Sequence, residues 1–68
     1  MKYRYIGTIE LSDLEDNSIT VPFEFEHEEQ LIHCFVKHYA IQYVFDNNLA
    51  PTSYCRIGSM GYKMGVIV

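Results

Sequence analysis

Positive charge is scarce in this chain, and long apolar runs are missing from it. Lys and Arg together number 5 against 9 Asp and Glu, which gives a formal net charge of −4 over 68 residues. No uncharged stretch approaches the roughly 20 residues that a membrane-spanning helix needs, and the amino end lacks the apolar region of a signal peptide. We therefore expect a soluble, cytoplasmic protein that has no membrane partner.

Cysteine and tryptophan are also sparse. The chain has no Trp and 2 Cys, which are Cys34 and Cys55. Two thiols do not make the disulfide framework of a small secreted protein, so we expect both to be reduced, with a single bridge between them as the alternative. Hydrophobic residues make up 49% of the chain, which is enough to bury a core. The length predicts one domain over residues 1–68 with a thin core.

Alternating apolar and polar residues predict a hairpin in the amino-terminal half. Residues 2–11 and 19–26 place apolar side chains at every second position, as half-buried strands do. An antiparallel pairing centred on Glu15 brings the apolar residues of both strands to one face. The predicted pairs on that face are Leu11 with Ile19, Ile9 with Val21, Gly7 with Phe23, and Tyr5 with Phe25.

The same register makes two predictions for the polar side of the hairpin. Arg4 comes to lie opposite Glu26, where the two charges attract each other. Pro22 has no N–H to give to a ladder, so the second strand is expected at a sheet edge or with a bulge.

The hydrophobic spacing changes to about 3.6 residues from Glu28 onward and predicts a helix that ends near Asn47 or Asn48. Glu28 and Glu29 suit the first turn, and Asn48 suits the left-handed position after the last turn. The alternative ends the helix near Tyr39 and makes residues 41–45 a strand. The side chains expected to face the sheet are Ile32, Phe35, Val36, Tyr39 and Tyr43.

Residues 53–57 and 62–68 are the remaining strand candidates, with residues 58–61, Gly-Ser-Met-Gly, as a tight turn between them. The predicted order is therefore β-β-α-β-β. An antiparallel sheet with one helix packed on one face buries these apolar stripes, so the fold class is α+β, a small two-layer sandwich.

Metal binding and catalysis have weak support in the sequence. Cys34 and His38 are spaced i, i+4, and His27, His33 or Cys55 would have to complete a zinc site, but paired ligand clusters are missing. Glu24 and Glu26 share a strand face, yet nothing predicts an apolar pocket that would separate their pKa values. We expect no metal, no cofactor, no catalytic residue and no enzymatic activity.

The distribution of charge is the most distinctive feature. From Tyr5 to Val36 the chain has no Lys or Arg. We expect the carboxylates of this span to gather at one rigid end of the sheet. Carboxylates on a rigid hairpin could imitate the phosphates of a nucleic acid and fill a basic groove, whereas the few cations argue against direct nucleic-acid binding. The acidic residues of this span, our candidate partner-binding residues, are Glu10, Asp13, Glu15, Asp16, Glu24, Glu26, Glu28 and Glu29.

These features predict a small acidic inhibitor that binds a basic nucleic-acid-handling protein. In size and charge the chain resembles phage-encoded anti-defence proteins, among them anti-CRISPR proteins. The alternative is a structural or assembly protein that forms a homodimer through the outer face of its helix, while the acids only maintain solubility. The residues of that face are Leu31, Ile41 and Phe45.

Overall fold

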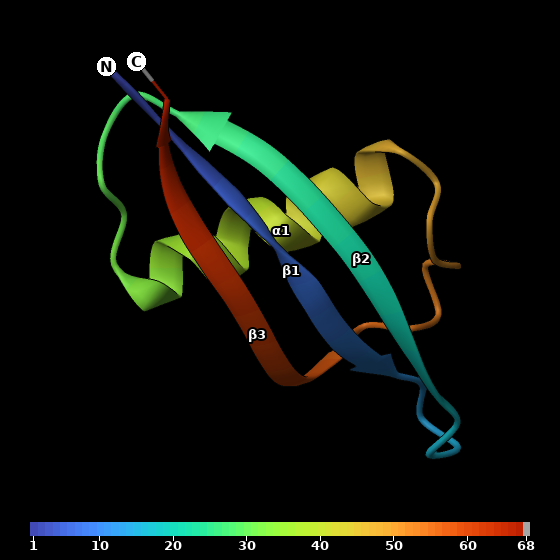
Figure 1. The fold of residues 1–68 in the computed structure, drawn as a ribbon. Helices are drawn as coiled ribbons and strands as arrows, with labels where there is room; N and C mark the ends of the chain where they lie inside the picture. The colour runs from blue at the N-terminus through green and yellow to red at the C-terminus, as the bar shows by residue number, and fades with distance from the viewer. Residues whose placement is uncertain (68) are drawn as a thin grey trace.

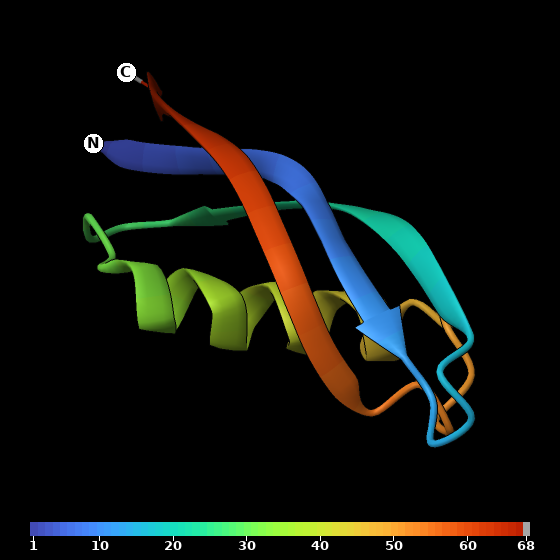
Figure 2. The same ribbon diagram turned by 90° about the horizontal axis from the view of Figure 1, so that it is seen from below.

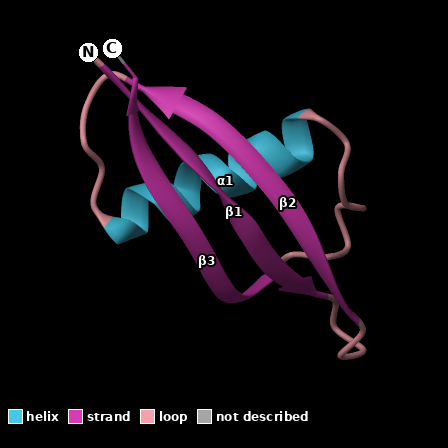
Figure 3. Cartoon of the chain, in the orientation of Figure 1, coloured by secondary structure: helices cyan, strands magenta, loops and turns pink. Residues whose placement is uncertain are grey.

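The computed structural model describes residues 1–67, which form three strands and one helix. The elements are β1 (Lys2–Ser12), β2 (Ser18–His27), α1 (His33–Asp46) and β3 (Arg56–Ile67). The strands make one antiparallel sheet in the order β2-β1-β3 (Figure 1, Figure 3). α1 packs on one face of this sheet, mainly over β2 (Figure 2), so the predicted α+β class is confirmed. Among the described residues, no helix is both long and apolar enough to cross a membrane.

The register of the β1–β2 hairpin is the one that the alternation predicts. Leu11 lies opposite Ile19 and Tyr5 opposite Phe25, with the two intermediate pairs also as expected. Tyr5 is fully buried and its ring stacks on Phe25 with 5.1 Å between centroids. Pro22 lies on β2, an edge strand, as its missing N–H requires.

The predicted pair of carboxyl-terminal strands is wrong, because one continuous strand, β3, pairs with β1 along its length. The observed order is therefore β-β-α-β, and Val68 lies outside the described residues. The glycines of β3 do not reverse the chain, since no described glycine has a positive φ. Gly58 instead leaves room for the side chain of Glu10, where a shift in register between Ile9 and Leu11 interrupts the ladder.

The helix begins later than its pattern predicts, at His33 instead of Glu28. Ile32 is the N-cap residue and makes no side-chain cap, and the first turn has no acidic residue. Glu28 and Glu29 belong to the connection between β2 and α1, which Tyr5 holds in place. The Leu31 amide therefore donates to the buried hydroxyl of Tyr5 and does not make the hydrogen bond of an additional helical turn.

The buried side of α1 is also displaced from the predicted stripe. Val36, Ala40 and Val44 are fully buried, whereas Ile32 is 63% and Phe35 53% exposed. These three small or branched residues, spaced four apart, let the helix approach a sheet face that already carries large aromatic rings. Of the remaining predicted residues, Tyr39 and Tyr43 are half-buried, and Tyr39 packs against Phe25 and His27 of β2.

The end of the helix follows the prediction. Asn47 is the C-cap residue, and Asn48 takes the left-handed conformation with φ 55°. The amide of Leu49 then donates to the carbonyl of Val44 at 2.9 Å, which satisfies one of the last helical carbonyls. The alternative strand at residues 41–45 is wrong.

Candidate functional site

The turn between β1 and β2 carries the first group of candidate carboxylates, which we name the turn acids: Asp13, Glu15 and Asp16. Asp13 organises the turn, because its carboxylate accepts hydrogen bonds from the amides of Glu15 and Asn17, each at 2.9 Å, and from the Asn17 side chain at 3.0 Å. The side-chain hydrogen bond from Asn17, reinforced by these amides, lowers the pKa of Asp13 below its ordinary value of 3.8. Asp13 is therefore committed to the turn, which leaves Glu15 and Asp16 as its outward charges.

The second group lies along β2 and just beyond it, and we name it the acidic edge: Glu24, Glu26, Glu28 and Glu29. Arg4 on β1 lies between the first two, 3.6 Å from Glu24 and 3.2 Å from Glu26. Arg4 lies directly opposite Glu26, as predicted, and its diagonal contact with Glu24 is an additional one. All three side chains are about half exposed, so they remain accessible to a partner.

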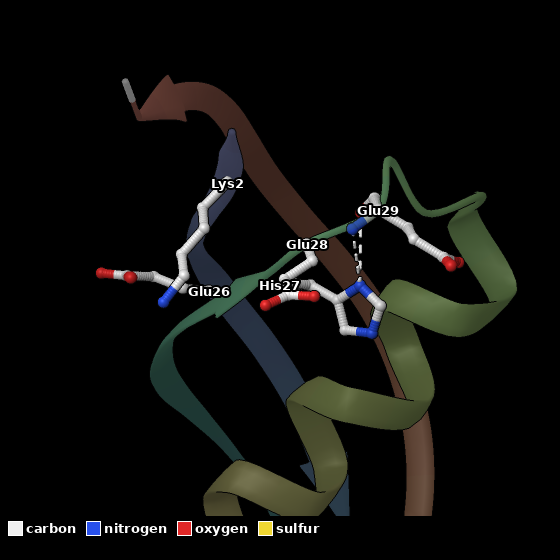
Figure 4. Close-up of a pocket in the computed structure, with 5 residues that line it drawn as sticks. All are labelled: Lys2, Glu26, His27, Glu28 and Glu29. Atoms are coloured by element: carbon white, nitrogen blue, oxygen red, sulfur yellow. Dashed lines mark hydrogen bonds between the residues drawn. The ribbon is translucent and has the colours of Figure 1, made fainter.

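A shallow cleft of about 360 Å³ marks the end of the acidic edge, lined by Lys2, Glu26, His27, Glu28 and Glu29. Lys2 and Glu26 extend to one side of the strand, while His27 turns toward Glu29 on the other (Figure 4). The Nδ1 atom of His27 accepts a hydrogen bond from the Glu29 amide at 3.1 Å. This contact fixes the direction of the backbone beyond β2 and with it the position of the last two carboxylates.

Glu10 belongs to neither group. It is half-buried on β1, and its side chain lies over Gly58 of β3. It therefore points toward the β3 edge of the sheet and away from β2, which carries the acidic edge. The prediction that one set of carboxylates would gather at one end therefore needs correction. β2 has 10 residues, so its ends are about 30 Å apart, whereas charges are screened beyond about 8 Å at physiological salt. The turn acids and Glu28 with Glu29 act as separate groups.

Cations reduce the charge of both groups. Arg4 offsets part of the acidic edge, and Arg56 of β3 lies 3.5 Å from Asp16 of the turn. The sequence predicts the Arg4–Glu26 pair through the hairpin register. The sequence did not predict the Arg56–Asp16 pair, because that pair depends on the course of β3. It also did not predict that Lys2 lines the cleft, because this depends on how the ends of β1 and β2 lie.

The residues predicted for self-association are less available than their helical positions indicate. Leu31, Ile41 and Phe45 are half-buried and pack against the core. Exposed apolar side chains lie elsewhere, notably at Phe35 of α1 and at Met64 and Val66 of β3.

The candidate metal ligands are scattered. Cys34 and Cys55 are free and exposed, and His33 stacks on Tyr62 with 5.8 Å between ring centroids. Within residues 1–67, no three His, Cys, Asp or Glu side chains are grouped so that they could hold a metal ion.

Comparison of the chain with protein-family models, with curated proteins and with solved structures found no match.

Proposed function

We propose that the chain is a protein-binding inhibitor that inserts its acidic edge into the basic nucleic-acid-binding groove of a partner protein. The observation that carries this proposal is the row of exposed carboxylates on β2 and the connection after it, Glu24 to Glu29, which the hairpin holds in a fixed order. Phage-type anti-defence inhibitors, anti-CRISPR-like proteins among them, are the class that the size and charge of the chain favour.

Rigidity is the physical reason why a folded acidic edge suits this role. The hairpin pairs every β2 residue from Ser18 to His27 with β1, and the His27–Glu29 hydrogen bond extends the order past the strand end. Carboxylates that are already ordered lose less conformational freedom on binding than those of a flexible tail. Their summed field also accelerates the encounter with a basic surface, an effect that salt weakens.

The proposal is tested by capturing partners from a bacterial lysate at low and at high salt, with duplex DNA as a competitor. We expect the captured proteins to bind nucleic acids, to be released by salt, and to be displaced by DNA. Reversing the charges of Glu24 and Glu26 to Lys should abolish the capture. Capture that survives this reversal, or that DNA does not reduce, contradicts the proposal.

A matched pair of variants separates position from total charge. Glu28→Gln and Ser59→Lys both change the formal net charge from −4 to −3. Glu28 lies on the acidic edge, whereas Ser59 is exposed on β3, at the opposite edge of the sheet. We expect Glu28→Gln to weaken binding to the identified partner more than Ser59→Lys does. Equal weakening would mean that net charge alone drives the interaction.

A further inference from the structure

The two edges of the sheet are protected unequally. β2 carries Pro22 and the charged Glu24 and Glu26, which are features that prevent another strand from pairing with an edge. β3 has 12 residues, with no Pro, Asp or Glu among them. Met64 is 39% and Val66 53% exposed on this strand. β3 is therefore a long edge that lacks the proline and the carboxylates of β2, and its charged residues are Arg56 at its start and Lys63 near its middle.

Pro22 also reveals which backbone groups of β3 face outward. It lies opposite Thr8 and has no N–H, so this pair is a non-hydrogen-bonded one, and the backbone groups of Thr8 point toward β3. Alternation along the ladder then directs the N–H and C=O of Gly61, Lys63 and Gly65 toward β1. The N–H and C=O of the residues between them, Tyr62, Met64 and Val66, point to the free edge.

The same residues place their side chains on the face of the sheet that carries the helix. Met64 lies opposite Tyr5 and Tyr62 opposite Gly7, both of which belong to the inner face of β1. α1 packs chiefly over β2 and leaves the inner side of β3 partly uncovered (Figure 2). The residues whose backbone groups point to the free edge therefore also include the exposed apolar side chains of β3, Met64 and Val66.

We propose that β3 pairs antiparallel with β3 of a second copy, about a two-fold axis at Tyr62. Two sheets of three strands would then form one sheet of six, with both helices on the same face. In this register Met60 faces Met64 of the second copy, and Tyr62 faces its own equivalent. Each of these pairs joins residues whose backbone groups point outward, so hydrogen bonding and apolar contact are satisfied together.

The geometry of the two edges favours a second copy over the other edge of the sheet. Lys63 faces Gly61 of the second copy, so the two Lys63 side chains are diagonal neighbours and no like charges lie directly opposite each other. A β2 edge cannot take the place of the second β3, because Pro22 lacks the donor that faces outward there. The pairing therefore closes as a dimer instead of growing into a filament, and it leaves both acidic edges free.

Sedimentation of the full chain over a wide concentration range tests the proposal. We expect a reversible dimer that Met64→Pro converts to a monomer, because this proline removes an outward N–H and no bond to β1. Gly65→Pro is the matched variant, since it removes a bond to β1 and should lower the melting temperature strongly. A wild type that is monomeric throughout, or a Met64→Pro variant that folds and remains dimeric, overturns the proposal.

Amide hydrogen exchange keeps the test valid if Met64→Pro does not fold. In the wild type, the amides of Tyr62, Met64 and Val66 should be protected at high concentration and exchange quickly after dilution. Those of Lys63 and Gly65 should remain protected at both concentrations. A dimer in which the first three amides exchange freely, or a monomer that instead adds a foreign extended peptide at β3, contradicts the pairing of two copies.

Discussion

The hydroxyl oxygen of Tyr5 lies 2.7 Å from the backbone nitrogen of Leu31 and accepts its hydrogen bond. The same hydroxyl donates to the carbonyl of Glu29 at 3.5 Å. A residue near the amino terminus thus holds the connection that carries Glu28 and Glu29, and it determines where the helix can begin. Fold stability and the position of the acidic edge depend on the same side chain.

Replacing Tyr5 with Phe should keep the aromatic packing and remove both hydrogen bonds. We expect a loss of about 1–3 kcal/mol in the free energy of unfolding, because the Leu31 amide loses its partner. The melting temperature should fall by about 4–8 °C for each kcal/mol, which calorimetry would measure. Exchange of the Leu31 amide should also accelerate. An unchanged melting temperature would show that the hydroxyl does not anchor the connection.

Gly7 and Gly61 offer a comparison of two glycines in neighbouring strands. A Cβ at residue 7 would lie 2.6 Å from the Cβ of Tyr62 and would also collide with the Gly61 carbonyl, whereas a Cβ at residue 61 meets nothing within 4 Å. Gly7→Ala should therefore cost about 2 kcal/mol or more through overpacking. Gly61→Ala should stay within about 1 kcal/mol of the wild type. Urea unfolding of both variants checks this difference, and equal midpoints would contradict it.

The hydrogen bonds at Asp13 predict a dependence of stability on pH. The Asn17 side chain and the turn amides lower the folded-state pKa of Asp13 below 3.8, so the unfolded chain binds this proton first as the pH falls. The stabilisation is fully present above about pH 4 and is lost as the pH decreases through the folded-state pKa. The difference in melting temperature between the wild type and Asp13→Asn should be constant from neutral pH to about pH 5 and shrink below pH 4. A difference that grows in acid would reverse the assigned sign.

The sequence predicts the hairpin in detail because period-two alternation leaves one register in which apolar residues meet on one face. It predicts the helix end equally well, since Asn48 provides a local signal for the left-handed conformation. The helix start and the continuity of β3 depend on distant partners. Tyr5 competes for the Leu31 amide, and Gly58 accommodates Glu10 within a strand although its local sequence is typical of a turn.

The same distinction applies to the candidate site. Local spacing identifies the acidic residues and predicts that Arg4 meets Glu26, which the ladder confirms. The predicted hairpin already implies that the acids divide between the two ends of β2, because residues 13–16 form its turn and Glu28 and Glu29 follow its far end. It does not predict the path of the chain beyond β2, which depends on tertiary contacts of Tyr5 and His27.

Arg4 provides a direct test of whether the acidic edge attracts cationic ligands. Arg4→Gln removes the cation that lies within 4 Å of Glu24 and Glu26. Because exposed ion pairs contribute about 0.2–1 kcal/mol, stability should change little, while affinity for a lysine oligopeptide should rise about 1.5- to 5-fold. Lys63→Gln gives the same net charge from the β3 edge and should raise this affinity less. Fluorescence anisotropy at low and moderate salt measures both variants, and equal gains would show that total charge, and not the acidic edge, determines binding.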